Sequence, residues 1–203
     1  LKYYNRHWVS ASAVIQARQD LGIDEDTHLL LSVAEFTARK HHVDVIEAFT
    51  KVARSDVHLA FAGSGPLMDQ MKQLAVELGV ADRIHFLGNR RDIPVLMRAA
   101  SANILVSAQE GLPRCVLESL ALETPTIGTR IRGTQDLLAD GCGLLVEVGD
   151  VDGLAAAMAE ILDQPEVARK MSKLGYRRIS IYDLESIVKL HEHLYTEALN
   201  ASS

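Results

Sequence analysis

Short apolar runs alternate with longer amphipathic segments over most of the chain. The first run, residues 28–34 (HLLLSVA), is almost entirely apolar, as expected for a strand buried on both faces of a sheet. The segment after it, 43–53, carries apolar residues at helical spacing. Repetition of this pair predicts right-handed βαβ units and a parallel sheet covered by helices on both faces. The further predicted strands are residues 57–62, 83–87, 103–107, 126–128 and 143–146.

The predicted helices connect these strands and continue beyond the last one. Gly79 is placed to end the helix that follows the second strand, because glycine readily adopts the left-handed conformation of a helix end. Asp150 opens the predicted helix at 153–162, with Asp152 as a candidate N-cap. The remaining predicted helices are 67–78, 93–100, 113–122 and 134–139, with helix-like sequence from Pro165 onward that includes 184–199.

These elements predict an α/β fold with one Rossmann-like, doubly wound parallel sheet of about six strands and a helical C-terminal tail. We expect three parts along the chain. Residues 1–27 form a linker and a first helix, residues 28–163 form the Rossmann-like domain, and residues 164–203 form C-terminal helices.

Composition narrows the possible functions. The net charge of −6 argues against a protein that binds nucleic acid through phosphate contacts. No apolar run approaches the roughly 18–20 residues of a membrane-spanning helix. Cys115 and Cys142 are not in CxxC spacing, and the eight histidines show no ligand spacing, so we predict reduced, buried thiols and no metal site.

Two acidic residues bracket the segment EGLPRCVLE, which joins the fourth predicted strand to a helix. Glu110 would lie in the loop and Glu118 in the helix. In open α/β sheets ligands bind at the carboxyl ends of the strands. Two acids at this junction suit a ligand that has both a sugar and a nucleotide end. The alternative for such a pair is two surface carboxylates.

Three further loops at the same predicted edge have chemistry suited to an anionic ligand. Arg39 and Lys40 follow the first strand and can bind a diphosphate; the alternative is a solvated basic loop. Gly65, in the turn GSGP, allows a close backbone approach or simply a tight turn. Asn89 and Arg90 follow the third strand and can surround a base or form a polar turn. Together, four such loops favour a common pocket.

An ordered set of segments resembles a known family. EGLPRCVLE, ETPTIGTRIRGTQDLL and GLLVEVGD, preceded by SVAEFTARKHHVDVIEAF, HLAFAGSGPL and RIHFLGNRRDIPVLMRAAS, span residues 28–163. They resemble the C-terminal, donor-binding half of retaining glycosyltransferases of GT-B type, family four (glycosyl transferases group 1). The opening LKYYN is similar to the linker of these enzymes, and the last helix is similar to the one that packs back toward their N-terminal domain.

The resemblance implies a role for each matching residue. Glu118 would accept hydrogen bonds from the ribose, and Glu110 would be the catalytic residue beside the donor sugar. Lys40 would bind the diphosphate. The other donor-binding residues would be Arg39, Gly65, Asn89, Arg90, Gly111, Leu112 and Pro113.

The resemblance also implies a reaction and its partners. The donor would be a nucleoside-diphosphate sugar, with UDP favoured and GDP or ADP possible, and no cofactor would be needed. A hexose-type sugar would pass to a glycan or lipid-linked acceptor held by an N-terminal domain outside this sequence, so the chain alone would be inactive. The setting would be bacterial polysaccharide synthesis in the cytoplasm, where the longer protein can associate peripherally with the inner face of the membrane. A nucleotide-sugar epimerase of the same architecture and a non-enzymatic nucleotide-binding module are the alternatives.

Four positions depart from the family pattern. Glu35 stands where an arginine commonly follows the first strand, and His41 replaces the usual glycine after Lys40. Glu123 also stands at a common glycine position, and Asp136 replaces a common glutamate. These departures put phosphate affinity in question more than the fold.

Overall fold

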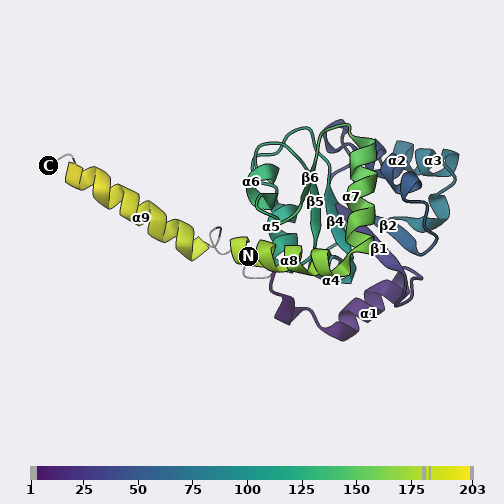
Figure 1. The fold of residues 1–203 in the computed structure, drawn as a ribbon, viewed down its shortest axis with the longest axis horizontal. Helices are drawn as coiled ribbons and strands as arrows, with labels where there is room; N and C mark the ends of the chain where they lie inside the picture. The colour runs from purple at the N-terminus through teal and green to yellow at the C-terminus, as the bar shows by residue number, and fades with distance from the viewer. Residues whose placement is uncertain (1–3, 180–181, 183, 202–203) are drawn as a thin grey trace.

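The sheet has six parallel strands in the order β3-β2-β1-β4-β5-β6 (Figure 1). The structure, a computed structural model, describes residues 4–179, 182 and 184–201. The predicted fold class is confirmed, and each predicted strand is found within two residues of its expected bounds. The strands are β1 (His28–Val33), β2 (Val57–Ala62), β3 (Ile84–Phe86), β4 (Ala102–Leu105), β5 (Thr126–Thr129) and β6 (Leu144–Val146).

The strand order contains one topological switch point. The chain runs outward from β1 through β2 to β3 and then returns to the other side of β1 to form β4. β1 therefore pairs with β2 from His28↔Val57 onward and with β4 at Leu30↔Ala102. Sheets of this order hold ligands outside the carboxyl ends of the strands at the switch point, here between β1 and β4.

Successive residues of β1 point into different cores, which explains its continuous apolar run. Leu30 packs into a cluster with Phe49 and Met158, whereas Leu29 and Leu31 pack into a second cluster with Leu96. The first cluster lies under α2 (His42–Val52), α3 (Met68–Glu77) and α7 (Val151–Asp163). The opposite face is covered by α1 (Ala11–Asp20), α4 (Ile93–Ala99), α5 (Arg114–Ala121) and α6 (Thr134–Leu138).

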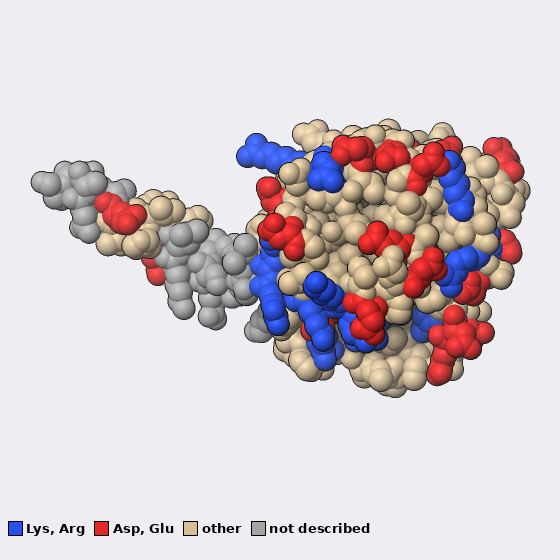
Figure 2. Space-filling view, in the orientation of Figure 1, with Lys and Arg blue, Asp and Glu red and all other residues tan. Residues whose placement is uncertain are grey.

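The C-terminal helices differ in how they meet the sheet domain. α8 (Pro165–Ile179) places Met171 in the first core and Ile179 in a core cluster with α5 and α6. Its lysines and arginines gather on the exposed surface at the lower left of Figure 2. α9 (Leu184–Ala201) extends away from the rest of the fold in Figure 1. Within the described residues, none of the helices combines the length and apolarity needed to cross a membrane.

The N-cap of α7 differs from the prediction. Asp150, not Asp152, is the capping residue, and its Oδ1 accepts a hydrogen bond from the Gly153 amide at 2.8 Å. The helix therefore starts at Val151, two residues before the predicted start. The Asp150 carboxylate, three residues before Gly153, accepts from a free amide in the first turn of the helix.

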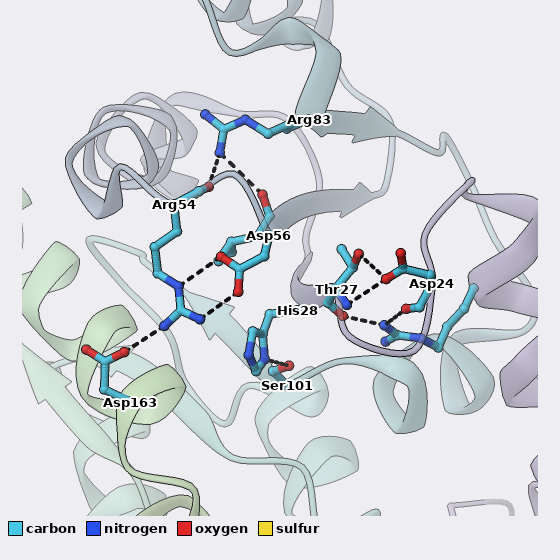
Figure 3. A network of polar contacts seen from close by, with 10 residues as sticks. Asp24, Thr27, His28, Arg54, Asp56, Arg83, Ser101 and Asp163 are labelled. Carbon is cyan, nitrogen blue, oxygen red and sulfur yellow. Dashed lines mark hydrogen bonds and ion pairs between the residues drawn. The ribbon is translucent and has the colours of Figure 1, made fainter.

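Polar contacts join the turns at the amino ends of the strands (Figure 3). The Arg54 guanidinium donates to both carboxylate oxygens of Asp56, at 3.0 and 2.7 Å, and to Asp163 at the end of α7 at 2.6 Å. Arg83 donates to the Arg54 carbonyl at 2.6 Å, and the Ser101 hydroxyl lies 3.2 Å from Nδ1 of His28. These contacts hold the edge of the sheet that is opposite the predicted site.

Short 3₁₀ turns precede the main elements at three places. η1 (Arg6–Trp8) lies in the linker, η2 (Ala38–Lys40) lies in the loop between β1 and α2, and η3 (Ala81–Arg83) leads into β3. η2 matters for function because it ends at Lys40, one of the predicted ligand-binding residues.

Candidate functional site

A pocket of about 500 Å³ lies at the switch point between β1 and β4. Its walls come from the loop after β1, the loop after β4, the start of α5 and the N-terminal linker. Five of the predicted site residues line it, namely Lys40, Glu110, Leu112, Pro113 and Glu118. The other lining residues are Tyr4, Val33, Arg114 and Cys115.

The centre of the pocket contains an ion pair between two predicted site residues. Lys40 Nζ donates to Glu110 Oε1, which joins the loop after β1 to the loop after β4. The two side chains are only 13% and 12% exposed, so little water screens their charges. Each residue therefore neutralises the other until a ligand offers either of them a different partner.

The loop after β4 is held at its base by its two neighbours. The Ala108 amide donates to the Arg39 carbonyl at 2.9 Å. On the other side, the buried Thr129 hydroxyl donates to the Ser107 carbonyl at 2.7 Å and accepts from the Ser107 amide at 3.1 Å. Arg39 thus supports the loop through its backbone, while its exposed side chain does not line the pocket.

Glu118 lies in the second turn of α5 and is only 8% exposed. Burial raises the pKa of its carboxyl, while the Tyr4 phenol and the Arg114 guanidinium act in the opposite direction and favour the charged form. Burial and the adjacent Glu118 carboxylate raise the pKa of Tyr4 to about 12. A carboxylate accepts several hydrogen bonds, so Glu118 can bind vicinal hydroxyls in addition to these partners.

Tyr4 and Arg114 were not predicted as site residues. Arg114 Nη2 lies 3.5 Å from Glu118 Oε1, and their i,i+4 spacing in a predicted helix was a readable signal. Tyr4 is in the linker, where no periodicity indicates what a side chain contacts. Its ring packs against core residues on the α5 side of the sheet, and only the tertiary structure brings it to Glu118.

The cysteine prediction is right for one residue and wrong for the other. Cys142 is buried, but Cys115 is only partly buried because it lines the pocket. Burial of the thiol raises the pKa of Cys115 to about 12, so the sulfur stays protonated and is a poor nucleophile. Among the described residues, no cluster of three or more histidine, cysteine or acidic side chains is arranged to hold a metal ion.

The loops after β2 and β3 pack on one another beside the pocket. The Gly63 amide donates to the Gly88 carbonyl at 2.8 Å, and the Ser64 hydroxyl donates to Asn89 Oδ1 at 3.0 Å. A Cβ on Gly65 would lie 2.6 Å from the Phe36 carbonyl oxygen, so this glycine allows the loops after β1 and β2 to touch.

Three predicted ligand contacts in these loops, Gly65, Asn89 and Arg90, do not line the pocket, and their roles stay predictions. Arg90 is engaged by Asp92 through two hydrogen bonds of 2.8 and 2.6 Å.

The chain was compared with known proteins. The sequence profile of glycosyl transferases group 1 matches residues 14–178. The chain belongs to this family. One curated relative, the N-acetyl-alpha-D-glucosaminyl L-malate synthase of Bacillus anthracis, is 32% identical over 91% of this chain and 49% of its own length. The chain spans about half the length of the curated relatives it matches.

Solved structures of glycosyltransferases share the fold. The Anabaena protein HepE, crystallised with UDP and glucose, superimposes with a TM-score of 0.80 at 22% identity, over 95% of this chain and 53% of its own. The C-terminal domain of LpcC, a group 1 protein from Francisella tularensis, superimposes with a TM-score of 0.75 at 20% identity, over 89% of this chain and 98% of its own.

Two of the residues that depart from the expected family pattern have a left-handed backbone. His41 and Glu123 stand where the resemblance led us to expect glycine, and their φ values are 42° and 54°. A residue with a side chain adopts positive φ less readily than glycine does. His41 Nδ1 lies 3.0 Å from the Asp44 carboxylate, and Glu123 forms an ion pair with Arg6 at 2.6 Å. Glu35 is exposed, so no cation is supplied at that position.

Proposed function

We propose that this chain binds a nucleoside-diphosphate sugar and is the donor-binding half of a retaining glycosyltransferase. The sugar would be a hexose-type unit, transferred to a glycan or a lipid-linked acceptor. The observation that carries the proposal is the pocket at the switch point. There a buried carboxylate, Glu118, and the little-exposed Lys40–Glu110 pair line one space at the start of a helix.

Each part of such a donor has a matching group in the pocket. Glu118 accepts hydrogen bonds from the two ribose hydroxyls, because a carboxylate offers two acceptor oxygens side by side. Lys40 and the N-terminus of α5, with the backbone of Gly111, Leu112 and Pro113 before it, take the diphosphate. Lys40 then exchanges the Glu110 carboxylate for phosphate oxygens, which frees Glu110 beside the donor sugar.

This allocation fits the chemistry of transfer. When the bond between the anomeric carbon and the diphosphate breaks, negative charge develops on the leaving group. A fixed cation and aligned backbone amides stabilise that charge without being consumed. Glu110 is positioned to bind sugar hydroxyls or to stabilise the anomeric carbon as it becomes electron-poor. Support also comes from HepE, whose crystals contain UDP and glucose on the same fold.

Complete transfer requires an acceptor site, which we place on the part of the longer relatives that this chain does not match. The described residues provide one side of a cleft, because the pocket is open to solvent at the carboxyl edge of the sheet. We therefore expect donor binding, and not turnover, from this chain. An epimerase would bind the same donors, and product analysis of a full-length parent with donor alone would distinguish it by epimerised nucleotide sugar.

The direct test is calorimetric titration of the chain with UDP, GDP and ADP. Glu118→Ala removes hydrogen bonds to a charged group worth about 1.5–3 kcal/mol, so nucleotide affinity should fall about tenfold to a hundredfold. Glu77→Ala removes an exposed helical glutamate and is the matched control. Lys40→Ala should weaken nucleoside diphosphates much more than nucleosides. A wild-type chain that binds none of the three nucleotides, or Glu118→Ala binding as wild type does, would contradict the proposal.

A further inference from the structure

Gly133, in the loop between β5 and α6, packs directly on the backbone of the loop after β4, which carries Glu110. A Cβ built on Gly133 would lie 2.0 Å from the Gly111 carbonyl oxygen, 2.9 Å from its carbon and 3.2 Å from the Glu110 carbonyl oxygen. Contacts under 3.0 Å do not occur for real Cβ atoms, and the atoms concerned are backbone that cannot rotate away. Gly133 also has a φ of +86°, which glycine adopts at little cost.

The other side of the Gly111 backbone is open to solvent. A Cβ on Gly111 would meet nothing within 4 Å, and Gly111 itself is exposed while Gly133 is buried. The residues on either side of Gly111 in the chain, Glu110 and Leu112, line the pocket. Gly133 therefore contacts one side of the Gly111 backbone, and the other side is exposed to solvent where a donor would bind.

The end of β5 and the loop after it contact the loop after β4 at two places. At the base, the Thr129 hydroxyl bonds both the amide and the carbonyl of Ser107. Nearer the tip, Gly133 contacts the Gly111–Leu112 peptide and the Glu110 carbonyl oxygen. Between them, the Ile131 amide donates to the Thr129 carbonyl at 2.8 Å, which makes a tight turn at the end of β5.

We propose that Gly133 is a positioning residue that sets the position of the Gly111–Leu112 peptide and thereby determines how well the pocket accepts the diphosphate and sugar of a donor. The inference rests on the proposed function. Nothing larger than hydrogen fits at Gly133 unless the peptide moves by about 1 Å, and a misplacement of that size can reduce catalysis about a hundredfold. Glu118, which we assign to the ribose, lies in α5, and it is not among the nearest contacts of a Cβ on Gly133.

The test compares Gly133→Ala with Gly149→Ala. Gly149 has nearly the same φ, +81°, but a Cβ there meets nothing within 4 Å. Gly149→Ala therefore controls for a side chain at positive φ, whereas Gly133→Ala adds the contact with the Gly111 backbone, and urea unfolding checks that both variants are folded. Affinity is measured for uridine, UDP and UDP-glucose by NMR titration, or for the guanine or adenine series where that base is the one bound.

We expect Gly133→Ala to bind UDP and UDP-glucose about tenfold or more weakly while its uridine affinity changes less than about twofold. Gly149→Ala should match the wild type with all three. Thr129→Val, which removes the hydroxyl that supports Ser107 but keeps the side-chain shape, should give the same selective loss and provides the answer if Gly133→Ala does not fold.

The possible outcomes separate the two proposals. Wild-type chain that binds no nucleotide overturns the proposed function and this inference with it. The wild-type chain can bind UDP while a folded Gly133→Ala or Thr129→Val variant binds it equally well. This result leaves the proposed function in place and overturns only the inference about Gly133. An equal loss for uridine and UDP would also overturn it, because a general loss of structure would affect both.

Discussion

The ion pair between Lys40 and Glu110 allows a quantitative prediction about the stability of the chain. Removing one partner, with Lys40→Met or Glu110→Gln, leaves the other side chain with an unbalanced charge where only 13% or 12% of it is exposed. Breaking a fully buried pair in this way costs about 3–5 kcal/mol. Because this pocket is open to water, we expect each single variant to lose about 1–3 kcal/mol of unfolding free energy.

The double variant distinguishes the pair from two independent residues. With both charges removed, no unbalanced charge remains, so we expect the loss in the double variant to be about 1–2 kcal/mol less than the sum of the single losses. Urea unfolding followed by far-UV circular dichroism measures all four proteins under one condition. The exposed pair Lys72–Asp69, with side chains 46% and 89% exposed, is the control and should show coupling below about 0.5 kcal/mol. Additive losses at Lys40 and Glu110 would refute the reasoning.

The same variants should change nucleotide binding in opposite directions. Glu110→Gln leaves Lys40 charged and without its carboxylate, so UDP should bind about threefold to tenfold more tightly. Lys40→Met removes the cation and should weaken UDP. If both variants weaken UDP equally, Lys40 does not exchange Glu110 for phosphate, and the assignment of these two residues fails even though the ion pair is real.

Three further predictions follow from single groups. Nucleotide affinity should fall in acid, because Glu118, whose pKa is raised by burial, becomes protonated and accepts fewer hydrogen bonds. Tyr4→Phe removes a hydrogen bond that stabilises the charged form of Glu118, so calorimetry over a pH series should show the fall in affinity beginning at higher pH. His42 is 3% exposed, and burial lowers its pKa to about 4, so the unfolded chain binds more protons between about pH 6.5 and 4. Stability is therefore lost as the pH falls through that window. His42→Leu should remove up to about 3 kcal/mol of this loss, measured by urea unfolding at pH 7 and pH 4. His41→Gly should raise the thermal unfolding midpoint, by relief of about 0.5–1 kcal/mol of backbone strain at a φ of 42°, and an unchanged or lower midpoint would show that the Asp44 contact outweighs the strain.

The sequence allowed the strands to be predicted because burial on both faces leaves a continuous apolar run. Residues 28–34 and 57–62 show it plainly, and the helices between them have clear periodicity. The site could be located at the strand ends for the same reason. Lys40 and Glu110 were both selected, but their pairing was not foreseen, since it depends on how two loops 70 residues apart in the chain meet.

Other features could not be obtained from local patterns. Tyr4 reaches Glu118 only because the linker folds back over α5, and nothing in LKYYN indicates that direction. The contact between Gly133 and Gly111 is likewise tertiary, although a glycine after Arg132 was visible in the sequence. The positive φ of His41 could be anticipated only from the glycine that the family commonly has there.

Under the proposed function, the charges that line the pocket limit how a diphosphate can be bound. Lys40 and Arg114 are balanced by Glu110 and Glu118, so the lining carries no net charge, and Glu35 supplies none at the position where the family commonly has arginine. A diphosphate must then be held by redistribution of existing pairs and by backbone dipoles, not by excess positive charge. Backbone dipoles act only at short range and in a fixed direction. The position of the Gly111–Leu112 peptide, set by the absence of a side chain at Gly133, therefore matters more in this chain than it would in a pocket with a surplus of cations.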